Sequence, residues 1–202
     1  MKLYFAPGAC SLAVHIALRE AGIGFDTVKV DLATHKTEDG GNYFDIAPRG
    51  YVPLLELDDG SRHTEAAALL QYLADQDPVQ ALIGEVGSTR RLAVTEWLAF
   101  VASELHKAFS PWLWHKETAD TTKRDVKVKL ATRFAELDKH LAEREYLAGE
   151  FSVADAYAFT IVNWSNFLGL PLSDTPHLRD YLARVSARPA VQAALKAEGL
   201  TK

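Results

Sequence analysis

The sequence predicts an α/β domain with a mixed sheet, followed by a domain made only of helices. Within roughly the first eighty residues, strand-like and helix-like apolar patterns follow one another in the order β-α-β-α-β-β-α. After Ser88 every apolar pattern has helical spacing. Between the two regions, residues 80–87 contain two glycines and are interpreted as a linker. We therefore expect an α/β domain at residues 1–79 and an all-helical domain at residues 88–202.

The elements of the first domain follow from the spacing of apolar residues. Alternation predicts strands at residues 2–5, 26–31 and 54–57, with a returning strand at 61–64 after an Asp-Asp-Gly turn. Helical spacing predicts helices at residues 11–22 and 65–75 and a short one near 43–46. The polar residues 34–42 are expected to form a loop.

The second domain is expected to contain helices at residues 90–109, 120–144, 152–167, 177–186 and 189–197. Ser152 and Asp155 have the spacing of a capping box, in which each side chain bonds the backbone amide of the other residue. This pair is interpreted as a folding device.

Composition and charge exclude several classes of protein. Of the 202 residues 48% are hydrophobic and 24% are charged, which is typical of a globular protein, and the net charge of -5 argues against a nucleic-acid binder. One cysteine cannot form an internal disulfide, so no oxidising compartment is required. The sequence shows no signal-peptide pattern and no apolar run of membrane-spanning length, so we expect a cytoplasmic protein without membrane partners. The motifs of phosphate, dinucleotide and zinc sites are also missing, so no metal and no permanently bound cofactor are expected.

The single cysteine, Cys10, is placed where the first strand has turned into the N-terminus of a helix. That end of a helix carries partial positive charge and free N–H groups, which favour an anion such as a thiolate. Lowering a thiol pKa from about 8.5 to about 7 needs roughly 2 kcal/mol, much of which a helix terminus can supply. The alternative is that Cys10 is a small buried hydrophobic residue.

Two backbone features are expected to lie near Cys10. The first is Val52-Pro53: a cis proline would leave the Val52 backbone able to pair with an extended peptide, whereas a trans proline at a sheet edge is the alternative. The second is Glu65-Ala66, where helix-initial amides could hold a carboxylate and Glu65 could hold an ammonium group. Glu65 could instead serve only to complement the helix dipole.

The helix expected at residues 90–109 has two distinct faces. Val94, Leu98, Val101 and Leu105 form an apolar stripe that is expected to face the core. Ala99, Ser103, His106 and Ser110 share a small, polar face suited to lining a cleft, so His106 is either a functional or a structural histidine. Trp164, Tyr157 and Phe167 could roof such a cleft or could pack in the core.

Over its whole length the chain resembles a beta-class (bacterial) glutathione S-transferase. The resemblance is carried by Lys2-Leu3-Tyr4, Pro7-Gly8-Ala9-Cys10-Ser11, Val52-Pro53, Thr64-Glu65, Gln71-Tyr72-Leu73-Ala74-Asp75, Glu96-Trp97-Leu98, Ser103-Glu104-Leu105-His106-Lys107, Val153-Ala154-Asp155-Ala156-Tyr157 and Arg188-Pro189-Ala190-Val191. The pair Cys10 and His106 points to the beta class. The resemblance implies a thioredoxin-like N-terminal domain, an all-α C-terminal domain and a homodimer with a cleft that contains Cys10.

The resemblance also implies a role for each site residue. Val52 would pair with the cysteinyl part of glutathione, and Glu65 and Ala66 would hold its γ-glutamyl end. His35 stands where the family usually has a lysine that meets the glycine carboxylate, and Ala99 stands where an asparagine is common. The remaining glutathione-binding residues would be Cys10, Ser103, Glu104, His106 and Lys107, with Ser103 and Glu104 reaching glutathione across the dimer interface.

Three functions remain open at this stage. The leading hypothesis is a transferase that conjugates the glutathione thiolate to small apolar electrophiles, with Cys10 and His106 as catalytic residues. In it His106 takes the thiol proton, and Cys10 is also able to form a mixed disulfide with glutathione. The second is a glutaredoxin-like thiol-disulfide or reductive-dehalogenating enzyme, in which Cys10 itself attacks and forms a mixed disulfide with glutathione. The third is a non-catalytic binding module, which would need neither Cys10 nor His106.

Overall fold

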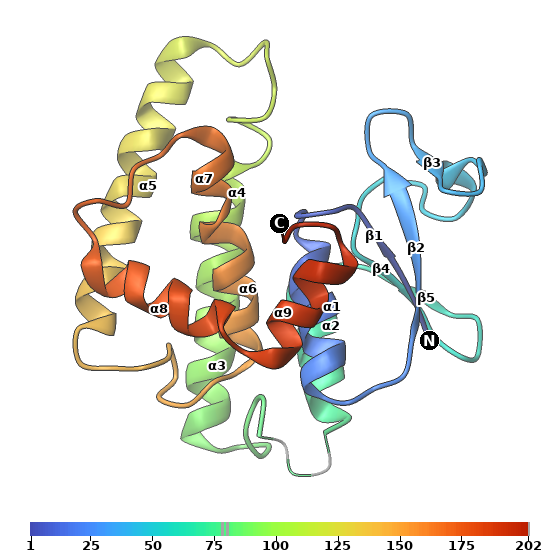
Figure 1. Ribbon diagram of the computed structural model, residues 1–202, viewed down its shortest axis with the longest axis horizontal. Coiled ribbons are helices and arrows are strands. Elements are labelled where there is room, and N and C mark those ends of the chain that lie inside the picture. The colour runs from blue at the N-terminus through green and yellow to red at the C-terminus, as the bar shows by residue number, and fades with distance from the viewer. Residues whose placement is uncertain (78, 80, 202) are drawn as a thin grey trace. The chain divides into compact units, whose positions relative to one another are not determined.

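A computed structural model describes residues 1–77, 79 and 81–201 of the chain. Pro78 and Gln80, at the end of the expected first domain and the start of the expected linker, lie outside the described residues. The chain divides into two compact units (Figure 1). The first contains Met1–Ala81 together with Arg188–Lys202, and the second contains Leu82–Ala187.

Among the described residues, the first unit has a five-stranded mixed sheet in the order β3-β2-β1-β4-β5. The strands are β1 (Lys2–Phe5), β2 (Asp26–Asp31), β3 (Lys36–Thr37), β4 (Leu54–Glu56) and β5 (Arg62–His63). β1 pairs with β2 in parallel and with β4 antiparallel, so the mixed sheet is confirmed. Residues 34–42, which the sequence predicts to be a loop, contain the short strand β3, which pairs with the end of β2. A strand of two residues is too short to show an alternating pattern.

Helices α1 (Ser11–Glu20) and α2 (Ala66–Asp75) lie against each other and cover one face of this sheet (Figure 1). Leu3 of β1 pairs with Leu55 of β4, and both side chains are fully buried. On the opposite face Tyr4 and Leu54 pack in one cluster with Tyr43, which begins the short 3₁₀ helix Tyr43–Asp45. The side chains of β1 and β4 point alternately to the two faces of the sheet, and the apolar ones are buried on both faces.

The last helix, α9 (Pro189–Ala197), packs against α1 and belongs to the first unit. The sequence pattern alone predicts this helix as part of the all-helical domain at residues 88–202. At its start, the Arg188 guanidinium donates hydrogen bonds of 2.7 and 2.8 Å to the Glu20 carboxylate. Just beyond its end, one carboxylate oxygen of Glu198 accepts a 2.9 Å hydrogen bond from the Gly8 N–H and the other lies 2.9 Å from Nδ1 of His15. These contacts hold α9 at both ends, although Arg188 and Glu20 are 168 positions apart in the sequence.

The second unit is helical throughout its described elements. It contains α3 (Thr89–Phe100), a π-helical segment (Val101–His106), α4 (Lys107–Phe109), α5 (Asp120–Leu141), α6 (Val153–Val162), α7 (Trp164–Leu168) and α8 (Pro176–Ser186). The helix expected at residues 90–109 is thus interrupted by π-helical turns, and the one expected at 152–167 divides at Asn163. The expected apolar stripe is confirmed, since Val94, Leu98, Val101 and Leu105 are buried. No described helix has the length and apolar character needed to cross a membrane.

Two local predictions can be compared directly with the second unit. The capping box is confirmed: the Ser152 N–H donates a 2.9 Å hydrogen bond to Asp155, whose carboxylate also accepts from the Leu147 N–H and the Tyr181 hydroxyl. Burial raises the pKa of the Asp155 carboxyl, and these donors act in the opposite direction. The expected linker is partly packed, because Leu82 is buried and its carbonyl accepts a 3.0 Å hydrogen bond from Val153 at the start of α6.

Candidate functional site

In the first unit the chain makes a tight turn between β1 and α1, and Cys10 ends that turn as the N-cap residue of α1. The buried hydroxyl of Ser11 closes the turn, because it accepts a 3.2 Å hydrogen bond from the Ala6 N–H and lies 3.3 Å from the Ala6 carbonyl. Gly8 has φ of 71°, a value that glycine adopts without steric strain, and its N–H is held by Glu198. The backbone before Cys10 is therefore held by two hydrogen bonds, one from Ala6 to Ser11 and one from Gly8 to Glu198.

The thiol of Cys10 is half-buried and is not part of a disulfide. Its Sγ lies 3.2 Å from the carbonyl oxygen of Val52, to which it donates a hydrogen bond. The Val52-Pro53 peptide bond is cis, which decides between the two alternatives left open by the sequence. The structure thus brings Cys10 and Val52 together. The helix terminus favours the thiolate of Cys10, whereas donation to a carbonyl favours the protonated thiol.

Glu65 is the N-cap residue of α2 and has an unusual backbone conformation, with φ of 70° and ψ of 104°. Positive φ is uncommon for a residue other than glycine, and such strain is concentrated at functional sites. The exposed carboxylate of Glu65 accepts a 3.2 Å hydrogen bond from the Arg49 guanidinium. Ala66 is the first residue of α2, so its N–H belongs to the first helical turn.

His35 lies in a separate part of the same unit, with φ of 51°. Its ring packs on Phe44 at 4.3 Å between ring centroids, and it lies so close to Gly50 that a Cβ atom there would be 2.8 Å from the ring. Nδ1 of His35 is buried and has no hydrogen-bond partner in the described part of the chain. The imidazole therefore has only Nε2 to offer to a ligand.

In the second unit His106 ends the π-helical segment and lies among aromatic side chains. Its Nδ1 is 2.7 Å from the hydroxyl oxygen of Tyr157 on α6, and its ring meets that of Trp164 edge-on at 5.1 Å. Burial lowers the pKa of His106 to about 4, and the nearby charge of Lys107 acts in the same direction. His106 is thus neutral at pH 7 and is a weak base toward a thiol.

The aromatic residues around His106 differ in exposure. Tyr157 and Trp164 are buried, whereas Phe167 is 64% exposed. Trp164 also meets Trp114 and Phe109 at ring-centroid distances of 5.6 and 5.8 Å. Of the three aromatic residues singled out in the sequence, two therefore pack inside the unit and one faces solvent.

The other polar residues of the Ser103–Lys107 motif have different surroundings from those of His106. The Ser103 hydroxyl donates a 2.8 Å hydrogen bond to the Ala99 carbonyl, and Lys107 is exposed. The Glu104 carboxylate accepts hydrogen bonds of 3.0 and 2.8 Å from Arg133 on α5 and pairs with Lys129 at 3.2 Å. These partners, Arg133 first, lower the pKa of Glu104. Glu104 is consequently an anion held by two cations of the same unit.

Sequence reasoning missed three partners of the candidate residues: Tyr157 for His106, Arg133 for Glu104 and Arg49 for Glu65. Each partner is at least sixteen positions away from its residue in the chain, and the first pair is 51 positions apart. No local pattern marks such a pair. From the sequence, Tyr157 is expected only to roof a cleft or to pack in the core, not to bond His106.

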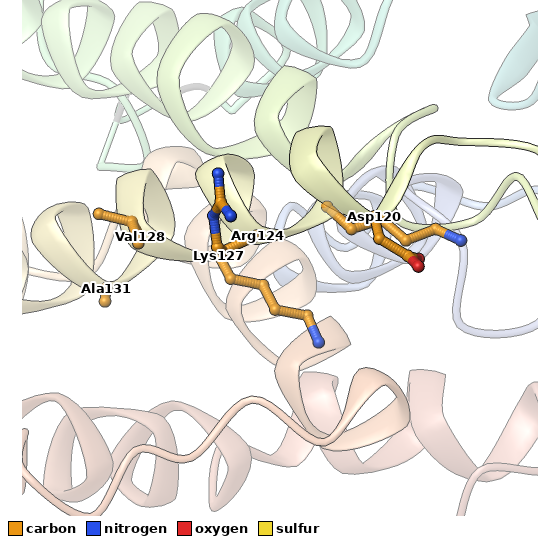
Figure 2. Close-up of a pocket in the computed structure, with 6 residues that line it drawn as sticks. Asp120, Arg124, Lys127, Val128 and Ala131 are labelled. Atoms are coloured by element: carbon orange, nitrogen blue, oxygen red, sulfur yellow. The ribbon is translucent and has the colours of Figure 1, made fainter.

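The basic residues of α5 line a shallow surface depression of roughly 540 Å³ (Figure 2). Its lining residues are Asp120, Lys123, Arg124, Lys127, Val128 and Ala131, all from this one helix. In Figure 2 the charged ends of Arg124 and Lys127 point away from each other. These two cations therefore do not converge, in keeping with a solvated helix face.

Comparison with known proteins gives consistent matches along the chain. The family models described as the N-terminal and C-terminal domains of glutathione S-transferase match residues 8–76 and 100–189. Glutathione S-transferase GstA of Escherichia coli O157:H7 is 43% identical over 201 residues, which cover 99% of this chain and all of that protein. A sphingomonad glutathione S-transferase solved in complex with glutathione is 46% identical over the full length of both chains, with a TM-score of 0.93. A bacterial beta-class enzyme from Sphingomonas chungbukensis is also 46% identical over both full lengths, with a TM-score of 0.94.

Proposed function

Because this chain belongs to the glutathione S-transferase family, we propose that it conjugates the thiolate of glutathione to small apolar electrophiles. The observation that carries the proposal is the placement of Cys10, whose half-buried thiol stands at the N-terminus of α1 and contacts the Val52 carbonyl. A tripeptide thiol that pairs with the Val52 backbone would lie beside this helix terminus, where negative charge on sulfur is stabilised.

The binding of glutathione is assigned to groups of the first unit. Val52 would pair its backbone with the cysteinyl residue, and the first-turn N–H of Ala66 would meet the γ-glutamyl carboxylate. Glu65 would hold the γ-glutamyl ammonium by a charge-assisted hydrogen bond, a role supported by its strained φ of 70°. His35 would donate one hydrogen bond from Nε2 to the glycine carboxylate.

The second unit is proposed to supply His106 as a catalytic residue and Ser103, Glu104 and Lys107 as further glutathione contacts. We propose a cytoplasmic homodimer in which Ser103 and Glu104 reach glutathione across the interface. Glu104 is fixed by Arg133 and Lys129, so its carboxylate is already in place for an ammonium group. A carboxylate has lone pairs for more than two donors.

Cys10 is proposed to have a second activity, the formation of a mixed disulfide with glutathione. The Cys10 thiolate would attack one sulfur of oxidised glutathione, form a new S–S bond and release the other half as a glutathione thiolate. Serine cannot carry out this step. We therefore expect intact-mass spectrometry to show one added glutathione per chain in the wild type and none in Cys10→Ser.

The main proposal is tested by measuring steady-state turnover of reduced glutathione with aryl halides, chlorinated aromatics and disulfides. Conjugation of an aryl halide by the wild type, with measurable activity retained in Cys10→Ser, is the expected result. If only disulfides are turned over and Cys10→Ser is inactive, the enzyme is a thiol-disulfide catalyst. If no substrate class is turned over, the proposed conjugation is wrong.

A further inference from the structure

The hydrogen bond between His106 and Tyr157 determines what His106 can do. The two atoms are Nδ1 of the imidazole and the hydroxyl oxygen of the phenol, 2.7 Å apart. The Tyr157 side chain is buried on α6, and the ring of Trp164 borders His106 at 5.1 Å. The pair is therefore held in place by packing, and its distance is at the short end for a hydrogen bond.

The direction of this hydrogen bond follows from acidity. A neutral imidazole carries one N–H and one bare nitrogen, and either ring nitrogen can hold the hydrogen. A phenol O–H, with a pKa of about 10, is far more acidic than an imidazole N–H, and the bare imidazole nitrogen is far more basic than a phenol oxygen. In a neutral pair the phenol therefore donates and Nδ1 accepts. The hydrogen of the His106 ring is then on Nε2.

We propose that Tyr157 is a positioning residue of the transferase reaction: it holds His106 in the Nε2–H tautomer, so that His106 donates a hydrogen bond to the glutathione sulfur instead of accepting its proton. This inference rests on the proposed catalytic role of His106. It replaces the expectation from sequence that His106 takes the thiol proton. A donor at that position stabilises the thiolate and releases it at attack, whereas a base would have to become charged inside an aromatic environment.

The surroundings of His106 agree with a neutral donor. Among the described contacts, the titratable groups that face it are Tyr157 from α6 and Lys107 from the following turn, and neither is an anion at neutral pH. Trp164 and Phe109 add only aromatic rings to this cluster. Nothing in this set would stabilise an imidazolium.

The first test measures the tautomer directly, without turnover. The ¹⁵N chemical shifts of the two ring nitrogens of His106 distinguish a protonated from a bare nitrogen, and the His106→Gln spectrum identifies this residue among the seven histidines. At pH 7.5 we expect a bare Nδ1 and a protonated Nε2 in the wild type. In Tyr157→Phe we expect both tautomers, because the donor to Nδ1 is lost. A protonated Nδ1 in the wild type, or an unchanged spectrum in Tyr157→Phe, would overturn the proposal.

The second test separates positioning from a structural effect by kinetics with glutathione and 1-chloro-2,4-dinitrobenzene. We expect Tyr157→Phe to lower kcat about three- to tenfold, the effect of losing one hydrogen bond. The matched control is Tyr181→Phe, which removes another buried hydroxyl of the same unit, one that bonds Asp155. It should alter thermal stability without changing kcat or the His106 spectrum. An equal loss of kcat in both variants would mean that Tyr157 has only a structural role.

A double-mutant cycle completes the design. In His106→Gln the side-chain amide has a fixed donor and no tautomers, so adding Tyr157→Phe should change kcat less than twofold. The same three- to tenfold loss in that background would show that Tyr157 does not act through His106. If the wild type binds glutathione but turns over no electrophile, the proposed conjugation fails while the spectrum still decides the tautomer.

Discussion

The partly buried position of His106, among aromatic side chains, predicts a specific pH dependence of stability. The perturbation is His106→Gln, which keeps a polar side chain of similar size but removes the titratable group. We expect the wild type to lose stability relative to this variant as the pH falls below 6.5. The reason is that the unfolded chain can protonate His106 more readily than the folded protein can.

The magnitude follows from the pKa of His106, which burial lowers from 6.5 to about 4. Between these two values the unfolded state binds a proton that the folded state does not, so stability rises with pH. Integrating this difference gives a relative loss for the wild type of about 1 kcal/mol at pH 6 and about 2 kcal/mol at pH 5, with almost none above pH 7.5. These values are order-of-magnitude estimates of the difference between the two proteins.

The assay is urea unfolding of both proteins at pH 7.5, 6 and 5, at one protein concentration, because self-association of either protein would couple to its stability. The quantity to follow is the wild-type minus variant difference in the free energy of unfolding. His115→Gln is the control, because it removes an exposed histidine of the same unit and should follow the wild type. A wild-type minus His106→Gln difference that stays constant from pH 7.5 to 5 would refute the reasoning, since His106 would then titrate alike in both states.

Two further predictions concern glutathione affinity, measured by calorimetry. Glu65→Gln should weaken glutathione binding by about one to two decades while the far-UV circular dichroism spectrum stays unchanged, because a charge-assisted hydrogen bond is worth roughly 1.5–3 kcal/mol. The control Arg49→Gln, which removes only the present partner of Glu65, should not weaken binding. Equal affinity of Glu65→Gln and the wild type would exclude the ammonium contact. His35→Lys should tighten glutathione binding at pH 8 about tenfold, because it adds a charged donor for the glycine carboxylate. The control His35→Gln should not tighten binding. If lysine brings no gain in affinity, this position does not meet the glycine carboxylate.

Much of the fold could be predicted because its signals are local. The apolar spacing after Ser11, the turn before Cys10 and the capping box at Ser152 each depend on residues within one or two turns of chain. The position of α9 could not be predicted in this way. Its own sequence shows a good amphipathic helix, but the groups that hold it, Glu20 and His15, lie more than 160 positions away.

In the candidate site, too, only features that depend on neighbouring residues could be predicted from the sequence. The placement of Cys10 at a helix N-terminus and of Val52 beside it could be expected from strand order and turn chemistry. The partner of His106 could not, because the pairing of Tyr157 with Nδ1 depends on the packing of α6 against the π-helical segment. An α-helix and a π-helical turn differ by one residue in the spacing of their hydrogen bonds, and the sequence pattern does not distinguish them.

The contacts of Glu198 also bear on how the protein is made. The unit that carries Cys10 is discontinuous in the chain, because all of Leu82–Ala187 is synthesised between its two parts. Chains grow from the N-terminus, so the turn around Gly8 exists on the ribosome long before the carboxylate that holds its N–H. The strands and α1 can form early, but Gly8 and His15 gain their contacts with Glu198 only when the C-terminal residues emerge. The turn that carries Cys10 is thus completed last, and a chain interrupted anywhere in Leu82–Ala187 would lack the hydrogen bond from Gly8 to Glu198.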